Sequence, residues 1–259
     1  MRRSYRIRIN LMCGIAGIVR FDNRPISDHR LATMLEQLRH RGPDGEGVVR
    51  KDHCALAHTR LSIIDLGGGD QPMHTPSSDE QGPLTIVFNG EIYNHRALRK
   101  QLESTGHVFH SNHSDTEVLL WGYRQWGKRL PERLEGMFAF AIWDRVQRQL
   151  FLCRDRIGKK PLYLRWSDDR SEISFASLVA TLVASDEGER KINRQALLDY
   201  LRLGYTHSES LIEGIEELVP AHWMLIDPSG RVQIERYWQQ PPVTSHPPVT
   251  DALEATGHV

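Results

Sequence analysis

Short apolar runs recur along most of the chain, separated by clusters of Gly, Pro, Asp and Ser. After a first run over residues 13–19 they read CALAH, LTIVFN, MFAFAIWD, QLFLCRD, PLYLRW and EISFA. Runs of this length between turn-forming residues are typical of strands in a buried sheet. The pattern therefore predicts many short strands.

Helical spacing interrupts these strands at four places. The first is a set of leucine and methionine positions behind a start signal at Ser27 and Asp28, namely Leu31, Met34, Leu35 and Leu38. Further helices are predicted after Asn94, after Ser114, where SDTE predicts a capping box, and over residues 193–203. The order strand, helix, strand, helix, strand predicts sheets that are covered by helices.

The last third of the chain first continues this folded pattern and then leaves it. HWMLID and VQIERYW flank the turn PSG and predict a hairpin. From Pro241 onward prolines cluster and no amphipathic period is visible, which favours a linker over a new domain.

Composition narrows the classes of function. The chain has 259 residues, enough for one large or two small domains, and 33 basic residues balance 33 acidic ones to a formal net charge of +0. This balance argues against nucleic acid or an anionic membrane as a partner and favours small neutral ligands. No apolar run approaches the roughly 20 residues that a membrane span needs.

The N-terminal segment and the cysteines bear on the compartment. Residues 1–11 contain four arginines but no apolar core, so they do not read as a secretory signal. Three widely spaced cysteines argue against a disulfide framework and a CxxC site, and indicate a reducing compartment. We therefore expect the cytoplasm. Three histidines in HVFHSNH are better read as surface polar residues than as ligands, and no metal site is assigned.

Cys13 has two readings. A lone cysteine in a strand is ordinarily a small packing residue. If everything through Met12 were removed, however, Cys13 would carry a thiol and a free α-amine together. The amine has a pKa of about 7.7–8 and the thiol a pKa of about 8.5, so the neutral amine could take the thiol proton. One residue would then serve as both nucleophile and base.

A set of ordered motifs decides between these readings. MCGIAGIV, RHRGPDG, LAHTRLSIID, FNGEIYN, SDTE, GMFAFAIWD and RDRIGKKPLY occur in this order. The set, from about residue 12 to residue 238, resembles the glutaminase domain of glutamine-dependent asparagine synthetases, which are class II amidotransferases. The resemblance implies an α+β fold of the N-terminal nucleophile hydrolase type, with four αββα layers in which two packed antiparallel sheets lie between helices.

The resemblance also implies roles for residues around Cys13. Hydrolysis of the glutamine amide needs hydrogen-bond donors for the oxyanion of a tetrahedral intermediate. In the family these are an asparagine side chain and the following glycine N–H, which correspond here to Asn89 and Gly90. Outside this context an Asn-Gly pair would be read as a tight turn.

Glutamine itself carries a carboxylate and an ammonium group that a specific site must bind. Arg60 matches the family's carboxylate ligand, a role that suits a guanidinium, and Leu61, Ser62, Ile63 and Ile64 would line the same pocket. Glu91 and Asp115 match the positions that hold the ammonium group. The alternative readings are that Arg60 is a solvated charge at a strand end, Glu91 is a surface acid and Asp115 is an acid in the first turn of a helix.

The chain departs from the family pattern at both ends. The leader, residues 1–12, would have to be removed or reflect a misassigned start, because an α-nitrogen in a peptide bond cannot act as a base. Residues 13–238 form the predicted amidotransferase domain, and residues 239–259 a linker toward a synthetase domain that is missing here. No cofactor is expected in this chain, since ATP and Mg²⁺ would bind only in that domain.

The predicted function is hydrolysis of L-glutamine to glutamate and ammonia, with a synthetase domain in cis or on a partner chain using the ammonia to convert aspartate to asparagine. One rival is a non-catalytic module that senses glutamine. Another is an amidotransferase domain that serves a different acceptor, as in glucosamine-phosphate synthases and amidophosphoribosyltransferases. Homodimer formation stays open.

Overall fold

A computed structural model describes residues 12–22, 24–61, 69–76, 79, 81–186, 188–206 and 209–242. Within these ranges the strands form two six-stranded sheets, and every pairing between neighbouring strands is antiparallel. The order across the first sheet, sheet A, is β10 (Ile215–Glu217), β8 (Tyr163–Trp166), β9 (Glu172–Ala176), β1 (Gly14–Arg20), β3 (Cys54–Arg60) and β2 (Gly45–Lys51).

The second sheet, sheet B, contains the longest apolar strands. Its order is β12 (Val232–Arg236), β11 (His222–Ile226), β7 (Gln149–Arg154), β6 (Gly136–Asp144), β5 (Leu84–Ile92) and β4 (Met73–His74). Strands β5 and β6 pair over their full nine residues. This long pairing gives the centre of sheet B a fixed register.

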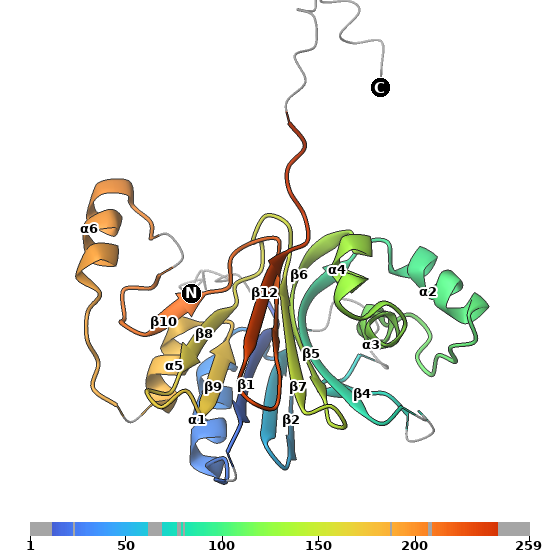
Figure 1. Cartoon of the computed structure of the whole chain (residues 1–259), viewed down its shortest axis with the longest axis horizontal. Coiled ribbons are helices and arrows are strands. Elements are labelled where there is room, and N and C mark those ends of the chain that lie inside the picture. Colours follow the sequence, from blue (N-terminus) through green and yellow to red (C-terminus); the bar gives the residue numbers. More distant parts are fainter. Residues whose placement is uncertain are drawn as a thin grey trace, which may run out of the picture.

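Helices cover the outer face of each sheet, so the molecule has four layers (Figure 1). On sheet A lie α1 (Asp28–Leu38) and α5 (Val179–Ser185), and on sheet B lie α2 (His95–Ser104), α3 (Asp115–Trp126) and the short α4 (Leu130–Arg133), which follows a 3₁₀ turn at Gly127–Arg129. Helix α6 (Arg194–Leu203) stands at the side of the molecule, before β10. The αββα layering agrees with the expected fold class.

Three apolar cores hold the four layers together. One lies between α1, α5 and sheet A, a second between the two sheets, and a third between sheet B and its helices. Alternate residues of a strand point to opposite faces of a sheet. In β3, Ala55 and Ala57 therefore face α1, while Cys54 and Leu56 face sheet B. Burial on both faces explains why these strands read as nearly continuous apolar runs.

The predicted strands and helices are present, but the prediction of a capping box at SDTE is wrong. Ser114 is the N-cap of α3, yet its side chain makes no capping hydrogen bond. The carboxylate of Glu117 instead accepts the backbone N–H groups of His110 and Ser111, both at 2.8 Å. Glu117 is buried, and the loop before the helix supplies the donors that satisfy its charge.

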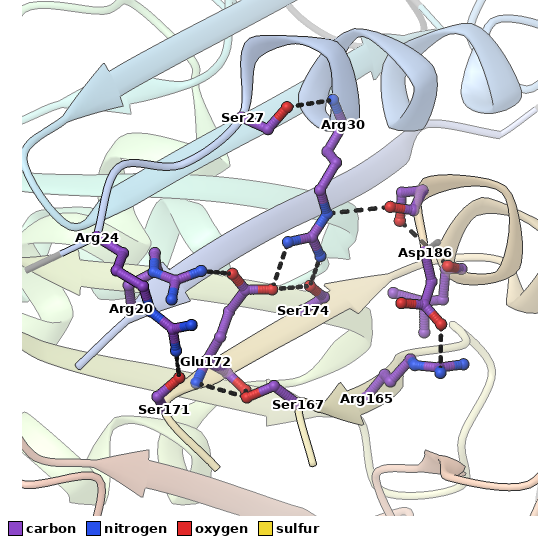
Figure 2. Close-up of polar contacts among 12 residues, drawn as sticks. Arg20, Arg24, Ser27, Arg30, Arg165, Ser167, Ser171, Glu172, Ser174 and Asp186 are labelled. Atoms are coloured by element: carbon purple, nitrogen blue, oxygen red, sulfur yellow. Dashed lines mark hydrogen bonds and ion pairs between the residues drawn. The ribbon is translucent and has the colours of Figure 1, made fainter. Parts of the chain in front are cut away.

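An ion-pair cluster joins α1 to sheet A (Figure 2). The buried carboxylate of Glu172 lies between Arg20 Nη1 at 2.5 Å and Arg30 Nη1 at 2.7 Å. Arg30 also donates to Ser174 Oγ and to the Ser185 carbonyl. Since these groups come from β1, α1, β9 and α5, the cluster ties the outer helical layer to the sheet. Among the described residues no helix is long and apolar enough to cross a membrane.

Candidate active site

Cys13 lies directly before β1, at the end of the sandwich between the two sheets. The Leu61 N–H donates to its sulfur at 3.4 Å, and Sγ lies 3.7 Å from the Leu61 carbonyl oxygen. The guanidinium of Arg41 donates from Nε to the Cys13 carbonyl at 3.1 Å. Cys13 is therefore held by two segments that are distant in sequence, one at its thiol and one at its carbonyl.

A cavity of about 110 Å³ opens beside Cys13. It brings together the predicted site residues that the structure describes: Cys13, Arg60, Leu61, Asn89, Gly90, Glu91 and Asp115. The other predicted pocket positions, Ser62, Ile63 and Ile64, lie outside the described residues. The cavity is thus lined by a thiol, an amide, a guanidinium and two carboxylates.

Asn89 and Gly90 lie inside β5, not in a turn. Asn89 is 1% exposed, and its Nδ2 has no hydrogen-bond partner in the described part of the chain. A Cβ atom on Gly90 would lie 2.2 Å from the Met137 carbonyl oxygen and 2.7 Å from Phe138 Cα. Glycine is therefore required where β5 passes close to β6, and the amide beside it is an unused donor at the cavity.

The register of β5 turns a backbone donor toward the same cavity. The N–H of Phe88 donates to Gln71 Oε1 at 2.6 Å, and that of Ile92 donates to Asp115 Oδ2 at 3.1 Å. Residues two apart along a strand direct their N–H groups to the same edge. The Gly90 N–H therefore lies between these two bonds, on the edge of β5 that Gln71 and Asp115 occupy.

Charged groups of both signs line the cavity. The Arg60 side chain is only 11% exposed, and its Nη1 lies 2.6 Å from the carboxylate of Asp70, which is 93% exposed. Burial raises the pKa of Asp115, and the Ile92 N–H opposes this rise. Arg60 is therefore not a solvated charge, and it already binds a carboxylate here.

The electrostatic surroundings of the Cys13 thiol act in two directions. Burial raises its pKa, whereas the Leu61 N–H and then the charges of Lys160, Arg60 and Arg41 lower it. The other two cysteines, Cys54 and Cys153, are buried in strands, and burial raises the pKa of each far above the ordinary value. Both side chains are packing residues, Cys54 in the core between the two sheets and Cys153 in the core between sheet B and its helices.

Several residues that surround Cys13 or line the cavity have no role in the sequence prediction: Arg41, His58, Gln71 and Lys160. Arg41 and Lys160 belong to the motifs RHRGPDG and RDRIGKKPLY, which carry the resemblance, so the motifs themselves were the available signal. Gln71 joins β5 to α3, because its amide also donates to Thr116 Oγ1 at 3.3 Å.

His58 is the most deeply buried ionisable group of the cavity, at 1% exposure. Burial lowers its pKa to about 4, and the nearby backbone of Phe88 opposes this shift. Neither ring nitrogen makes a hydrogen bond of normal geometry within the described residues. The ring is therefore neutral at pH 7. Over the same ranges no three His, Cys, Asp or Glu side chains lie together as a metal site.

The family model of the glutamine amidotransferase domain matches residues 12–238. The chain belongs to this family. It is 36% identical over 230 residues to asparagine synthetase [glutamine-hydrolyzing] 3 of Bacillus subtilis, covering 88% of this chain and 36% of the relative. It is 40% identical over 180 residues to asparagine synthetase [glutamine-hydrolyzing] 3 of Arabidopsis thaliana, covering 69% and 29%. The chain thus spans about a third of the length of these relatives.

A solved structure supports the same fold. The glutamine phosphoribosylpyrophosphate amidotransferase of B. subtilis matches with a TM-score of 0.65 and 22% sequence identity, over 88% of this chain and 50% of that chain. At this identity the likeness concerns the fold alone. Together with the two sheets and their helical layers, it confirms the α+β class and the αββα layering expected from the resemblance.

Proposed function

We propose that this chain hydrolyses glutamine to glutamate and ammonia, with Cys13 as an N-terminal nucleophile after removal of the residues before it. One observation carries the proposal. A single cavity joins the thiol of Cys13 to an unused amide donor, a guanidinium and two carboxylates. These groups complement the side-chain amide, the α-carboxylate and the α-ammonium of glutamine.

Binding would orient the substrate before any bond changes. Arg60 would exchange the carboxylate of Asp70, which is 93% exposed and is returned to water on release, for that of the substrate. Glu91 and Asp115 would hold the ammonium group. Fixing both charged ends directs the side-chain amide toward Cys13, and such positioning contributes a large part of a barrier reduction.

In the first chemical step the neutral α-amine of Cys13 takes the thiol proton. The sulfur then bonds to the amide carbon of glutamine, and the carbonyl electrons move to oxygen. The Asn89 amide and the Gly90 N–H donate to that oxyanion. Because both donors are held in place by β5 before substrate arrives, they need no reorganisation as the charge develops.

The intermediate then collapses in two stages. The bond between carbon and nitrogen breaks, the α-ammonium of Cys13 gives its proton to the leaving nitrogen, and ammonia departs from a glutamyl thioester. Water next adds to the thioester carbon, with the α-amine as base, and the bond between carbon and sulfur breaks. Glutamate leaves, and the thiol and the amine are regenerated.

The use of the ammonia belongs to the wider proposal. The asparagine synthetase relatives are about three times as long as the matched region, so aspartate, ATP and Mg²⁺ would bind to a synthetase part in cis or on a partner chain. That part would act as a ligase that converts aspartate to asparagine. We also place the reaction in the cytoplasm, in keeping with the free thiols of Cys13, Cys54 and Cys153.

The test compares two cysteine substitutions in protein that begins at Cys13, as verified by intact mass. Cys13→Ala should abolish glutamate release from glutamine, because no other described cysteine lines the cavity. Cys54→Ala, in the core of sheet A, is the matched control and should keep the activity. Glutamate release by Cys13→Ala would refute the mechanism. Glutamine binding without turnover by the unsubstituted chain would favour a sensor instead.

A further inference from the structure

Lys160 lies on a loop between β7 and β8 that buried charges hold rigidly. The carboxylate of Asp155 accepts the N–H groups of Ile157 at 3.1 Å and of Lys159 and Lys160 at 2.9 Å. Arg154 Nε donates to the Lys160 carbonyl at 2.9 Å. Asp155 is 0% and Arg154 4% exposed. The backbone of Lys160 is therefore fixed on both sides, so its side chain starts from a defined position.

The side chain of Lys160 enters the cavity that Cys13 lines. Lys160 is 7% exposed, and in the described part of the chain its ammonium has one hydrogen-bond partner, the sulfur of Met12 at 3.3 Å, and no ion-pair partner. A thioether is a weak acceptor, and a buried ammonium ordinarily requires a carboxylate. Burial of this ammonium therefore has a desolvation cost, and a structural role for Lys160 does not explain why that cost is tolerated.

The charges around Lys160 and Cys13 single out this lysine. Burial lowers the pKa of the Lys160 ammonium, and the charges of Cys13, Arg41, Asp155 and Glu91 also act on it. Three cations act on the thiol, of which Lys160 acts most strongly, before Arg60 and Arg41. Arg41 donates to the Cys13 carbonyl and Arg60 is paired with Asp70. Within the described residues, the Lys160 ammonium is held only by the sulfur of Met12, the residue whose removal the proposed function requires.

We propose that Lys160 sets the protonation state of the N-terminal Cys13 once Met12 has been removed, keeping its α-amine neutral before attack and stabilising the thiolate that forms when this amine takes the thiol proton. A fixed positive charge disfavours a second ammonium group nearby and favours a thiolate. Both effects prepare the nucleophile and its base at neutral pH. This inference rests on the proposed function, because it assumes a free amine on Cys13. Lys160 acts through Cys13 and is therefore a positioning residue.

The experiment uses protein that begins at Cys13 and compares Lys160→Met, Lys160→Gln and Lys160→Arg. Lys159→Met is the matched control, since it removes a neighbouring charge that is exposed. For each protein the rate of Cys13 alkylation by iodoacetamide is measured from pH 5 to 10, with the site located by mass. The kcat/KM for glutamine is measured over the same range.

Loss of the charge should move the alkylation midpoint upward by about one pH unit and slow alkylation at pH 7 about tenfold. The acidic limb of kcat/KM should move upward in parallel, because the amine then keeps its proton to higher pH. Lys160→Arg and Lys159→Met should retain the profile of the unsubstituted chain. Two neutral variants are used so that a folded one, verified by circular dichroism, decides the result.

Coincident alkylation profiles for the folded neutral variants and Lys159→Met would overturn the inference. The alkylation profile does not depend on glutamine turnover. A shifted alkylation midpoint in a set of proteins that all fail to release glutamate would therefore refute the proposed function and leave the role of Lys160 supported.

Discussion

Replacing Asn89 by alanine should separate activity from stability. The side chain is 1% exposed and its Nδ2 has no partner in the described part of the chain, a state that costs a buried polar group about 1–3 kcal/mol. Truncation removes this cost and loses some packing, but the side chain already borders a cavity of about 110 Å³. The two effects oppose each other, so the free energy of unfolding should stay within about 1 kcal/mol of the parent value.

The same substitution should strongly reduce turnover. Removal of one oxyanion donor lowers kcat by about 100- to 1,000-fold, or about 2.7–4 kcal/mol of transition-state stabilisation. The KM for glutamine should change much less, because the donor is needed when charge develops on the oxygen and not when the neutral amide binds. Glutamate release at saturating and limiting glutamine separates the two quantities, and urea unfolding gives the stability.

Asn94 provides a matched control near the end of β5. Its Nδ2 donates to the Arg133 carbonyl at 2.9 Å, and its Oδ1 accepts the Glu135 N–H at 3.1 Å. Asn94→Ala should therefore lose about 1–2 kcal/mol of stability and keep its kcat. The reasoning is refuted if Asn89→Ala loses as much stability as Asn94→Ala while it keeps its kcat, since the Asn89 amide would then be a structural group.

Two further predictions concern stability. In the parent chain the folded pKa of His58, about 4, lies below the unfolded value of about 6.5, so stability that is present above pH 6.5 is lost on acidification, about 2 kcal/mol by pH 5. His58→Gln should remove this pH dependence. Urea unfolding of both proteins at pH 7.5 and pH 5 measures the difference. Glu172→Gln removes a buried carboxylate from the buried Arg20, which keeps its pair with Asp22, and from the partly exposed Arg30, and should cost about 3 kcal/mol. The control Glu103→Gln removes a carboxylate that is 45% exposed from its pair with Arg99 and should cost no more than about 0.5 kcal/mol; equal losses in urea unfolding would contradict the burial argument.

Strands that are buried on both faces could be predicted from the sequence because their apolar runs are nearly continuous, as in β5 and β6. The edge strand β2 reads GEGVVRK, and no residue in it is fully buried, so hydrophobicity gave no signal for it. Helix α5 has only seven residues, too few for a helical period to stand out. Strands β4 and β10 have two and three residues, and pairing with longer neighbours defines them.

The candidate site divides in a similar way. Cys13, Asn89 and Asp115 lie in motifs whose family roles are known, so resemblance identified them, although hydropathy alone would have assigned Cys13 to packing. Residues such as Arg41 and Lys160 reach the nucleophile only through the tertiary fold. Arg41 follows α1 and contacts the Cys13 carbonyl, and Lys160 arrives on the loop after β7. The order of residues along the chain does not indicate how far apart such segments lie in space.

The chemistry of the site depends on the contact between the sheets. Cys13 and Arg60 extend from β1 and β3 of sheet A, whereas Asn89 and Gly90 belong to β5 of sheet B, and β1 and β3 both pack on β5. Under the proposed mechanism, neither sheet alone holds both the nucleophile and the oxyanion donors. Because packed cores resist small changes of shape, the inter-sheet core keeps the thiol and the donors at a fixed separation, which electrostatic stabilisation of an oxyanion requires. The apolar residues that sequence reasoning assigns to packing are therefore also the residues that set the geometry of the reaction.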